Sequence, residues 1–156
     1  MPFSTDGVYT IRNIGRALML DLKGDSTAEG NQIQGYADNG TEAQKWVIKK
    51  QEEPRNSENT FTIQTSNTGN NGNGFFAAAK QDADEPVVYT RQAFLVDLVP
   101  GVNDIYSIKF TLGSKNLVLS IPSDEDSAVR LANFNAADAY QQWALIRVGD
   151  LQSVGN

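Results

Sequence analysis

A short motif occurs three times in this chain and constrains its fold more than any other feature of the sequence. Each copy has a glutamine, a variable residue and an aromatic residue, followed by an aliphatic run. The copies are Gln44-Lys45-Trp46, Gln92-Ala93-Phe94 and Gln141-Gln142-Trp143. Their glutamines are separated by 92 − 44 = 48 and 141 − 92 = 49 residues. Because a motif that recurs at one period indicates copies of one structural unit, we expect three repeats.

A second pattern marks the start of each repeat. An aromatic residue stands two positions before an isoleucine, with threonine or serine between them, at residues 8–11 (VYTI), 60–63 (TFTI) and 105–108 (IYSI). This alternation has the period of two that is typical of a half-buried strand. Two independent patterns with nearly the same period support the division into three repeats.

Short apolar stretches separated by turn-forming residues fill each repeat. The sequence predicts strands at 8–11, 17–22, 32–36 and 44–49, at 60–65, 75–80, 87–90 and 94–99, and at 105–110, 116–121, 128–132 and 141–148. A short helical turn is expected at 136–140. Twelve short strands without a helix of ordinary length predict an all-β, closed or nearly closed structure, which protects its sheet edges.

The length of 156 residues fits one domain that can bury a core. We expect this single domain at 1–150, with repeats at about 7–50, 58–100 and 104–148, and a loose tail at 151–156. The first seven residues are polar and lack the apolar core of a signal peptide. No apolar run approaches the roughly 20 residues that span a bilayer. We therefore expect a cytoplasmic protein without membrane insertion, with export by a non-classical route left open.

Composition argues against several classes of function. The net charge of 13 − 19 = −6 argues against nucleic acid as a partner, because nucleic acid attracts basic surfaces. The chain has no cysteine for a disulfide or thiolate, and no histidine, the usual general base and metal ligand. Three carboxylate pairs lie in polar loops without apolar walls that would raise a pKa. They are Glu52/Glu53, Asp82/Asp84 and Asp124/Asp126. We expect no catalytic residue, metal or cofactor.

The stretch LDLKGDSTAEGNQIQGYADNGTEAQKW at residues 20–46 carries the most informative local pattern. It reads L-D-L, a loop, I-x-G-aromatic, and then the Q-x-W motif. With the triple motif, this order resembles the ricin B-type β-trefoil lectins, in particular fungal members that commonly lack disulfides and signal peptides. The resemblance extends over residues 7–148. It implies a β-trefoil of three four-stranded repeats with pseudo-threefold symmetry, and a carbohydrate-binding protein that is not an enzyme.

The motif itself has a structural interpretation. Trp46, Phe94 and Trp143 are expected to fill equivalent positions in the core, because large aromatic side chains are usually buried. The glutamines two residues earlier are expected to hydrogen-bond the backbone of loops.

A sugar site needs an aromatic ring for the apolar face of a pyranose and fixed polar groups for its hydroxyls. Repeat one offers both. Asp21 alternates with leucines, so it should face away from the core, while Gln34 and Tyr36 share the outward face of the next strand. Asn39 and Gln44 belong to the loop that follows.

The resemblance assigns roles to the same residues. In the lectin family the strand-two aspartate, an aromatic platform and polar residues before the tryptophan bind sugar, which corresponds here to Asp21, Tyr36 and the polar group Gln34, Asn39 and Gln44. Gly35, next to Tyr36 in the strand, is expected to leave room beside the tyrosine ring. Plant members often have asparagine where this chain has Ala43, and tryptophan is common where it has Tyr36. Glycans or glycoproteins ending in galactose or N-acetylgalactosamine are the expected partners.

Repeats two and three are expected to lack a complete site. At the Asp21 position repeat two has Ala78 or Ala79, and repeat three has Ser120. Tyr89 remains as a possible platform in repeat two, while Ala132 stands near the Tyr36 position in repeat three, two residues before Phe134. One weak site per chain would gain avidity in a homodimer or higher oligomer.

A different binding class stays open from the residues alone. β-Trefoils also include protease inhibitors, which present one loop to the protease, with lysine or arginine for trypsin-like targets. Candidate residues in or beside loops are Lys23, Lys80, Arg91 and Arg130. An actin- or receptor-binding trefoil is the third alternative. The inhibitor hypothesis needs nothing from Asp21 or Tyr36, whereas the lectin hypothesis depends on both.

Overall fold

The computed structural model describes residues 7–26, 30–50, 60–65, 75–78, 85–90, 96–101, 103, 105–110, 117–121 and 128–149. These residues form twelve strands and three short 3-10 turns. Repeat one contains β1 (Gly7–Asn13), β2 (Met19–Leu22), η1 (Lys23–Asp25), β3 (Ile33–Tyr36), η2 (Glu42–Gln44) and β4 (Trp46–Lys50). Repeat two contains β5 (Thr60–Thr65), β6 (Phe75–Ala78), β7 (Val87–Thr90) and β8 (Val96–Pro100). Repeat three contains β9 (Ile105–Phe110), β10 (Leu117–Ser120), β11 (Arg130–Asn133), η3 (Ala139–Gln141) and β12 (Trp143–Gly149).

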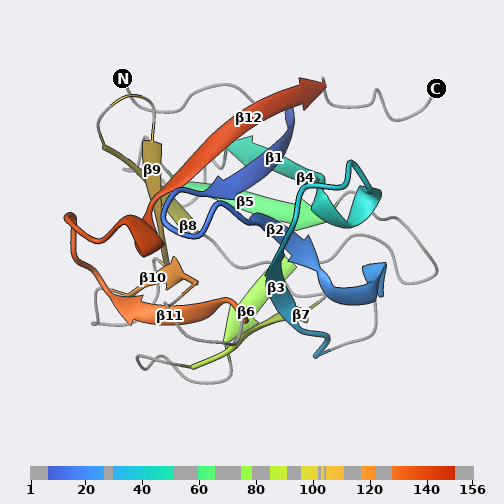
Figure 1. Ribbon diagram of the computed structural model, residues 1–156, viewed down its shortest axis with the longest axis horizontal. Helices are drawn as coiled ribbons and strands as arrows, with labels where there is room; N and C mark the ends of the chain where they lie inside the picture. Colours follow the sequence, from blue (N-terminus) through green and yellow to red (C-terminus); the bar gives the residue numbers. More distant parts are fainter. Residues whose placement is uncertain are drawn as a thin grey trace.

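Hydrogen-bonded pairing joins six of the strands in a closed antiparallel barrel. Figure 1 shows β12 beside β1, where the barrel closes. Its neighbouring pairs are β1–β4, β4–β5, β5–β8, β8–β9, β9–β12 and β12–β1. Each repeat supplies its first and last strand to this ring. The ring is closed by β12, which runs beside β1 with Arg147 opposite Tyr9 and Trp143 opposite Asn13. The first and last strands of the chain are therefore neighbours.

The other six strands form three hairpins, β2–β3, β6–β7 and β10–β11. Single bridges join the hairpins in a cycle, at Gln32↔Val88, Pro86↔Arg130 and Ala128↔Gln34. This cycle is the pseudo-threefold arrangement of a β-trefoil, so the predicted fold is confirmed. It also defines equivalent positions, because Gln34, Val88 and Arg130 each pair with the next hairpin in the same way.

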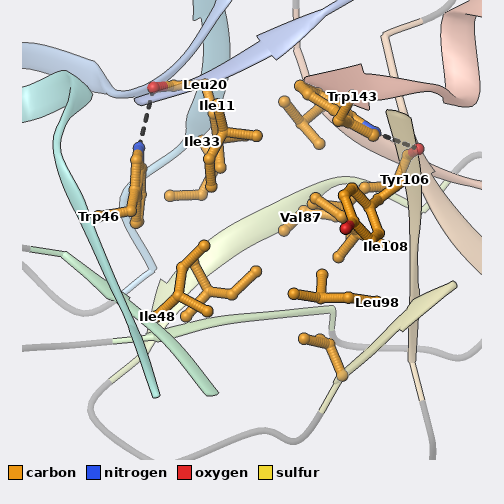
Figure 2. Packing of buried hydrophobic residues seen from close by; sticks show 14 of the residues in the cluster. Ile11, Leu20, Ile33, Trp46, Ile48, Val87, Leu98, Tyr106, Ile108 and Trp143 are labelled. Atoms are coloured by element: carbon orange, nitrogen blue, oxygen red, sulfur yellow. Dashed lines mark hydrogen bonds between the residues drawn. The ribbon is translucent and has the colours of Figure 1, made fainter. Parts of the chain in front are cut away.

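The core lies between the barrel and the hairpins, and both tryptophans are buried in it (Figure 2). The Trp46 indole Nε1 donates to the Leu20 carbonyl oxygen at 3.0 Å, and the Trp143 Nε1 donates to the Leu119 carbonyl oxygen at 3.1 Å. The prediction of equivalent core positions is confirmed for these two residues. Phe94 lies outside the described residues.

Some element boundaries differ from the sequence prediction. Gln44 and Gln141 end 3-10 turns, and the strands β4 and β12 begin two residues later. Ala17 was expected to begin a strand, but its φ of 56° is left-handed, so β2 starts only at Met19. The helical turn expected at 136–140 is shorter and lies later in the chain, as η3 at Ala139–Gln141. Across the described ranges, no helix is long and apolar enough to cross a membrane.

Candidate functional site

The hairpin β2–β3 brings Asp21 and Gln34 together. The two residues are directly paired across the strands, and the Gln34 Nε2 donates to Asp21 Oδ1 at 3.1 Å. Asp21 lies on the side opposite the buried Leu20 and Leu22, as predicted, yet only 4% of its surface is exposed. A buried carboxylate needs polar partners, and these are amide groups here.

Gln44 supplies the second partner of this carboxylate. Its Nε2 donates to Asp21 Oδ2 at 2.9 Å and to the Ala37 carbonyl oxygen at 2.8 Å, while its Oε1 accepts from the Asn39 backbone N–H at 3.0 Å. The prediction that this glutamine hydrogen-bonds loop backbone is confirmed. Because Gln44 is fully buried, it connects Asp21 rigidly to the loop after β3.

The exposed part of the site is formed by Tyr36 and Asn39. Tyr36 shares the outward face of β3 with the half-buried Gln34, and 52% of its surface is exposed. The Asn39 Oδ1 accepts from the Thr41 backbone N–H at 3.1 Å and from the Thr41 hydroxyl at 2.8 Å. This turn uses the oxygen of Asn39, so its Nδ2 is the group that can donate to a ligand.

The chemistry of this group suits a polyol. A carboxylate has about four lone-pair sites, and the two amide bonds to Asp21 use only part of them. The remaining acceptor capacity suits vicinal hydroxyl groups, while the exposed face of Tyr36 suits an apolar patch of C–H groups. The geometry therefore brings Asp21, Gln34 and Gln44 into one hydrogen-bonded group, with Tyr36 and Asn39 exposed on the same hairpin and loop.

Gly35 has a different role from the one predicted. It is buried and faces the core, where an added Cβ would lie 2.5 Å from Ile121 Cδ1 and 3.1 Å from Leu18 Cβ. The expectation that Gly35 leaves room beside the ring of Tyr36 is therefore wrong, because Gly35 faces the core and Tyr36 faces outward. A side chain is absent at this position because neighbouring core residues occupy the space.

Repeat two differs from the prediction at two positions. Tyr89 occupies the inward position equivalent to Gly35 and is only 1% exposed, so the interpretation of Tyr89 as a platform is wrong. The residue paired with Val88, and hence equivalent to Asp21, is Ala77 rather than Ala78 or Ala79. Thr90, at the Tyr36 position, is buried. The motif residues 92–94 and Arg91 lie outside the described residues.

Repeat three reproduces the glutamine contacts without the carboxylate. Gln141 Nε2 donates to the Asn133 carbonyl oxygen at 2.8 Å, and its Oε1 accepts from the Asn135 backbone N–H at 2.8 Å. Ser120 pairs with Arg130, and Val118 with Ala132, so the predicted counterparts of Asp21 and Tyr36 are confirmed. Sequence reasoning missed Asn135 as the counterpart of Asn39, because the loop of repeat three is one residue longer. The signal that could have identified Asn135 is its place in an Asx turn, in which the Ala137 N–H donates to Asn135 Oδ1 at 3.0 Å.

Comparison with protein families identifies the chain. A family model described as "Ricin-type beta-trefoil lectin domain-like" matches residues 3–80, which is half of the chain. The chain belongs to this lectin family. No curated protein sequence matches it.

Solved structures similar to this lectin-family chain share its fold. The Rhizoctonia solani agglutinin is 26% identical, with a TM-score of 0.79 over 95% of this chain and 100% of that chain. The Macrolepiota procera ricin B-like lectin, solved in complex with lactose, is 17% identical, with a TM-score of 0.71 over 95% and 100%. A designed 3-fold symmetric protein, ThreeFoil, is 15% identical, with a TM-score of 0.77 over 92% and 100%.

The other candidate residues of this lectin-family chain are scattered. Lys23 is exposed in η1, Arg130 is half-buried in β11, and Lys80 lies outside the described residues. The three carboxylate pairs also fall outside them. Among residues with a described placement, no group of three or more histidine, cysteine, aspartate or glutamate side chains could hold a metal ion.

Proposed function

We propose that this protein binds glycans ending in galactose or N-acetylgalactosamine through one main site in repeat one. The family and its lectin relatives support carbohydrate binding in general. The observation that carries the location is the buried Asp21, which two glutamine side chains hold beside the exposed Tyr36. Asp21, Gln34, Tyr36, Asn39 and Gln44 are the proposed binding residues.

The proposed roles follow from the chemistry of the sugar. In galactose the 3- and 4-hydroxyls are neighbours on one edge of the ring, so one carboxylate can accept from both. The bonds from Gln34 and Gln44 fix the orientation of Asp21 before the ligand arrives, which lowers the entropy lost on binding. The apolar face of the sugar would lie on Tyr36. The lactose bound by the Macrolepiota lectin ends in galactose, which agrees with this class of ligand.

The decisive test is a calorimetric titration of wild type and Asp21→Ala with lactose, N-acetylgalactosamine and maltose. We expect wild type to bind the first two and to bind maltose, which ends in glucose, at least about tenfold more weakly. Asp21→Ala should lose measurable binding, because a buried acceptor for two hydroxyls disappears. The matched control is Ser120→Ala, which changes the equivalent position of repeat three and should leave lactose binding unchanged.

Two outcomes contradict the proposal. If Asp21→Ala folds and binds lactose as wild type does, the site is not in repeat one. If wild type binds none of the sugars, a glycan array at neutral pH and inhibition assays against serine, cysteine and aspartic proteases become the next measurements.

A homodimer remains part of this proposal. One site of modest affinity gives little retention on a cell surface, whereas two linked sites raise the effective affinity by a factor of about 10² or more. Light scattering after size-exclusion chromatography measures the assembly directly. A monomer that nevertheless agglutinates cells would require a second site on the same chain.

A further inference from the structure

Repeat three has a reversed charge pattern at the positions that form the site in repeat one. The register that pairs Asp21 with Gln34 pairs Ser120 with Arg130. A neutral hydroxyl therefore replaces the carboxylate, and a guanidinium replaces the amide. The bridge cycle independently places Arg130 at the Gln34 position.

The loop after the hairpin also carries less negative charge in repeat three than in repeat one. Asn39 and Asn135 are equivalent, because each donates its backbone N–H to the motif glutamine and accepts an N–H two residues later. The residue before each asparagine is Asp38 in repeat one and Phe134 in repeat three, and both are exposed. Across these three positions, repeat one carries two carboxylates and repeat three carries one cation and an aromatic ring.

The scaffold beneath these changes is preserved. Gln141 makes the same two loop contacts as Gln44, and Trp143 donates to Leu119 as Trp46 does to Leu20. The bond from the glutamine to a carboxylate has no counterpart, because Ser120 cannot supply one. Repeat three thus keeps the framework of a site while its ligand-facing groups differ in charge.

We propose that repeat three forms a second glycan-binding site that takes an acidic sugar, one whose ring carries a carboxylate or a sulfate. The Arg130 guanidinium would pair with the anionic group, a geometry in which arginine forms two parallel hydrogen bonds. Phe134, 36% exposed, would contact the apolar face of the sugar. Repeat one disfavours the same ligand, because Asp21 and Asp38 would repel the anion. The proposal goes beyond the neutral-sugar site and does not depend on it.

The surroundings of Arg130 limit the affinity of the repeat-three site for an anionic sugar. It lies between the buried Val129 and Leu131, so its half-buried side chain belongs to the outward face of β11. Arg130 already takes part in an interaction within the protein. A guanidinium has five N–H donors, so a ligand can share it. The backbone of the half-buried Glu85 lies next to that of β11, since the N–H of Leu131, the residue after Arg130, donates to the Glu85 carbonyl oxygen at 2.9 Å. We therefore expect modest affinity that falls as salt is raised.

The test uses the full-length Asp21→Ala protein, in which the repeat-one site is removed. It is titrated at low salt with 3′-sialyllactose, which carries a carboxylate, with 3′-sulfolactose, and with lactose. We expect at least one acidic ligand to bind, lactose to bind at least about tenfold more weakly, and the difference to shrink at high salt. Binding of one acidic ligand alone identifies the anionic group that the site recognises.

Variants of repeat three then assign the site. Arg130→Gln, added to Asp21→Ala, should weaken the acidic ligand at least about tenfold, whereas Arg130→Lys should retain part of the preference. Because Arg130 has another contact, Arg130→Gln could lower stability, so the second variant is Ser120→Asp. That change places a carboxylate where repeat one already accommodates Asp21, and it should abolish binding of the acidic ligand without unfolding the protein.

Three outcomes overturn the proposal. These are acidic ligands that bind no better than lactose, Arg130→Gln with unchanged affinity, and Ser120→Asp with unchanged affinity. Failure of the repeat-one site is seen separately, because it would leave lactose binding intact in Asp21→Ala.

Discussion

At the scale of single residues, Asp21 shows how a nearly buried charge is accommodated here. Its two oxygens accept from the side chains of Gln34 and Gln44, and Gln44 in turn holds the loop. A carboxylate that already has two partners is held in one orientation, at the cost of part of its acceptor capacity. The same residue therefore links the hairpin to the loop and is proposed to bind the ligand.

Tyr36 is expected to separate binding from stability. Because it is half exposed, Tyr36→Ala should change the free energy of unfolding by less than about 0.5 kcal/mol. It should weaken lactose binding about tenfold, since the apolar face of the sugar loses its ring. Tyr36→Phe keeps the ring and should bind within about threefold of wild type. Urea unfolding and calorimetry measure the two effects, and wild-type binding by Tyr36→Ala would exclude this residue as the platform.

Ala17 carries backbone strain that glycine would relieve. Its φ of 56° is left-handed, and the residue is exposed in the turn before β2. For an L-residue this conformation costs roughly 1–2 kcal/mol. Glycine avoids this cost, but it loses more conformational entropy on folding, which offsets part of the gain. Ala17→Gly should therefore raise the free energy of unfolding by about 0.5–1 kcal/mol. The control Ala144→Gly, within β12, should lower it by a similar amount, so equal signs for the two would refute the argument.

At the scale of elements, the hairpins of repeats one and three are each anchored to the barrel by an indole. The bond from Trp46 to the Leu20 carbonyl oxygen connects the start of β4 to β2. Trp46→Phe should lower the free energy of unfolding by about 1–3 kcal/mol, because a buried carbonyl loses its donor. Trp46→Ala should cost about 3–5 kcal/mol, since a cavity is added. Trp143→Phe is the matched control, with the same loss expected at Leu119.

The strands were predicted more successfully than their ends. Thr60–Thr65, Val87–Thr90 and Ile105–Phe110 have the predicted bounds, because short runs rich in β-branched and aromatic residues are typical of strands. Gln44 was placed in a strand and instead ends a 3-10 turn. Its side chain is required by distant partners, Asp21 and the backbone of Asn39, and such contacts are invisible in a local pattern.

At the scale of the whole molecule, the barrel makes the three repeats one cooperative unit. Strand β12 of repeat three closes the ring against β1 of repeat one, so neither repeat keeps its pairing if the other unfolds. This differs from a linear repeat array, in which each unit contacts only its neighbours.

The two tryptophans test this cooperativity. In Trp143→Phe the fluorescence of Trp46 reports on repeat one, and in Trp46→Phe that of Trp143 reports on repeat three. Within each variant, we expect fluorescence and far-ultraviolet circular dichroism to give the same urea midpoint, as two-state unfolding requires. Midpoints that separate within one variant would show that a repeat unfolds on its own.

The sequence by itself determined the three repeats, the all-β class and the buried role of the tryptophans. These features follow from period and composition, which local residues carry. It also placed Asp21, Gln34 and Tyr36 on the outward side of one hairpin, because alternation along paired strands decides the face.

Only the tertiary structure decided which positions of repeat two are equivalent to those of repeat one, and what each position contacts. Gly35 and Tyr89 occupy the same inward position in their repeats. Ile121 and Leu18 leave no space for a side chain at Gly35, whereas the buried ring of Tyr89 fills this position in repeat two. The pairing of Ser120 with Arg130 likewise depends on the register of a hairpin, which a loop of different length disguises in the sequence. Such contacts join residues far apart in the chain, so the folded backbone is needed to define them.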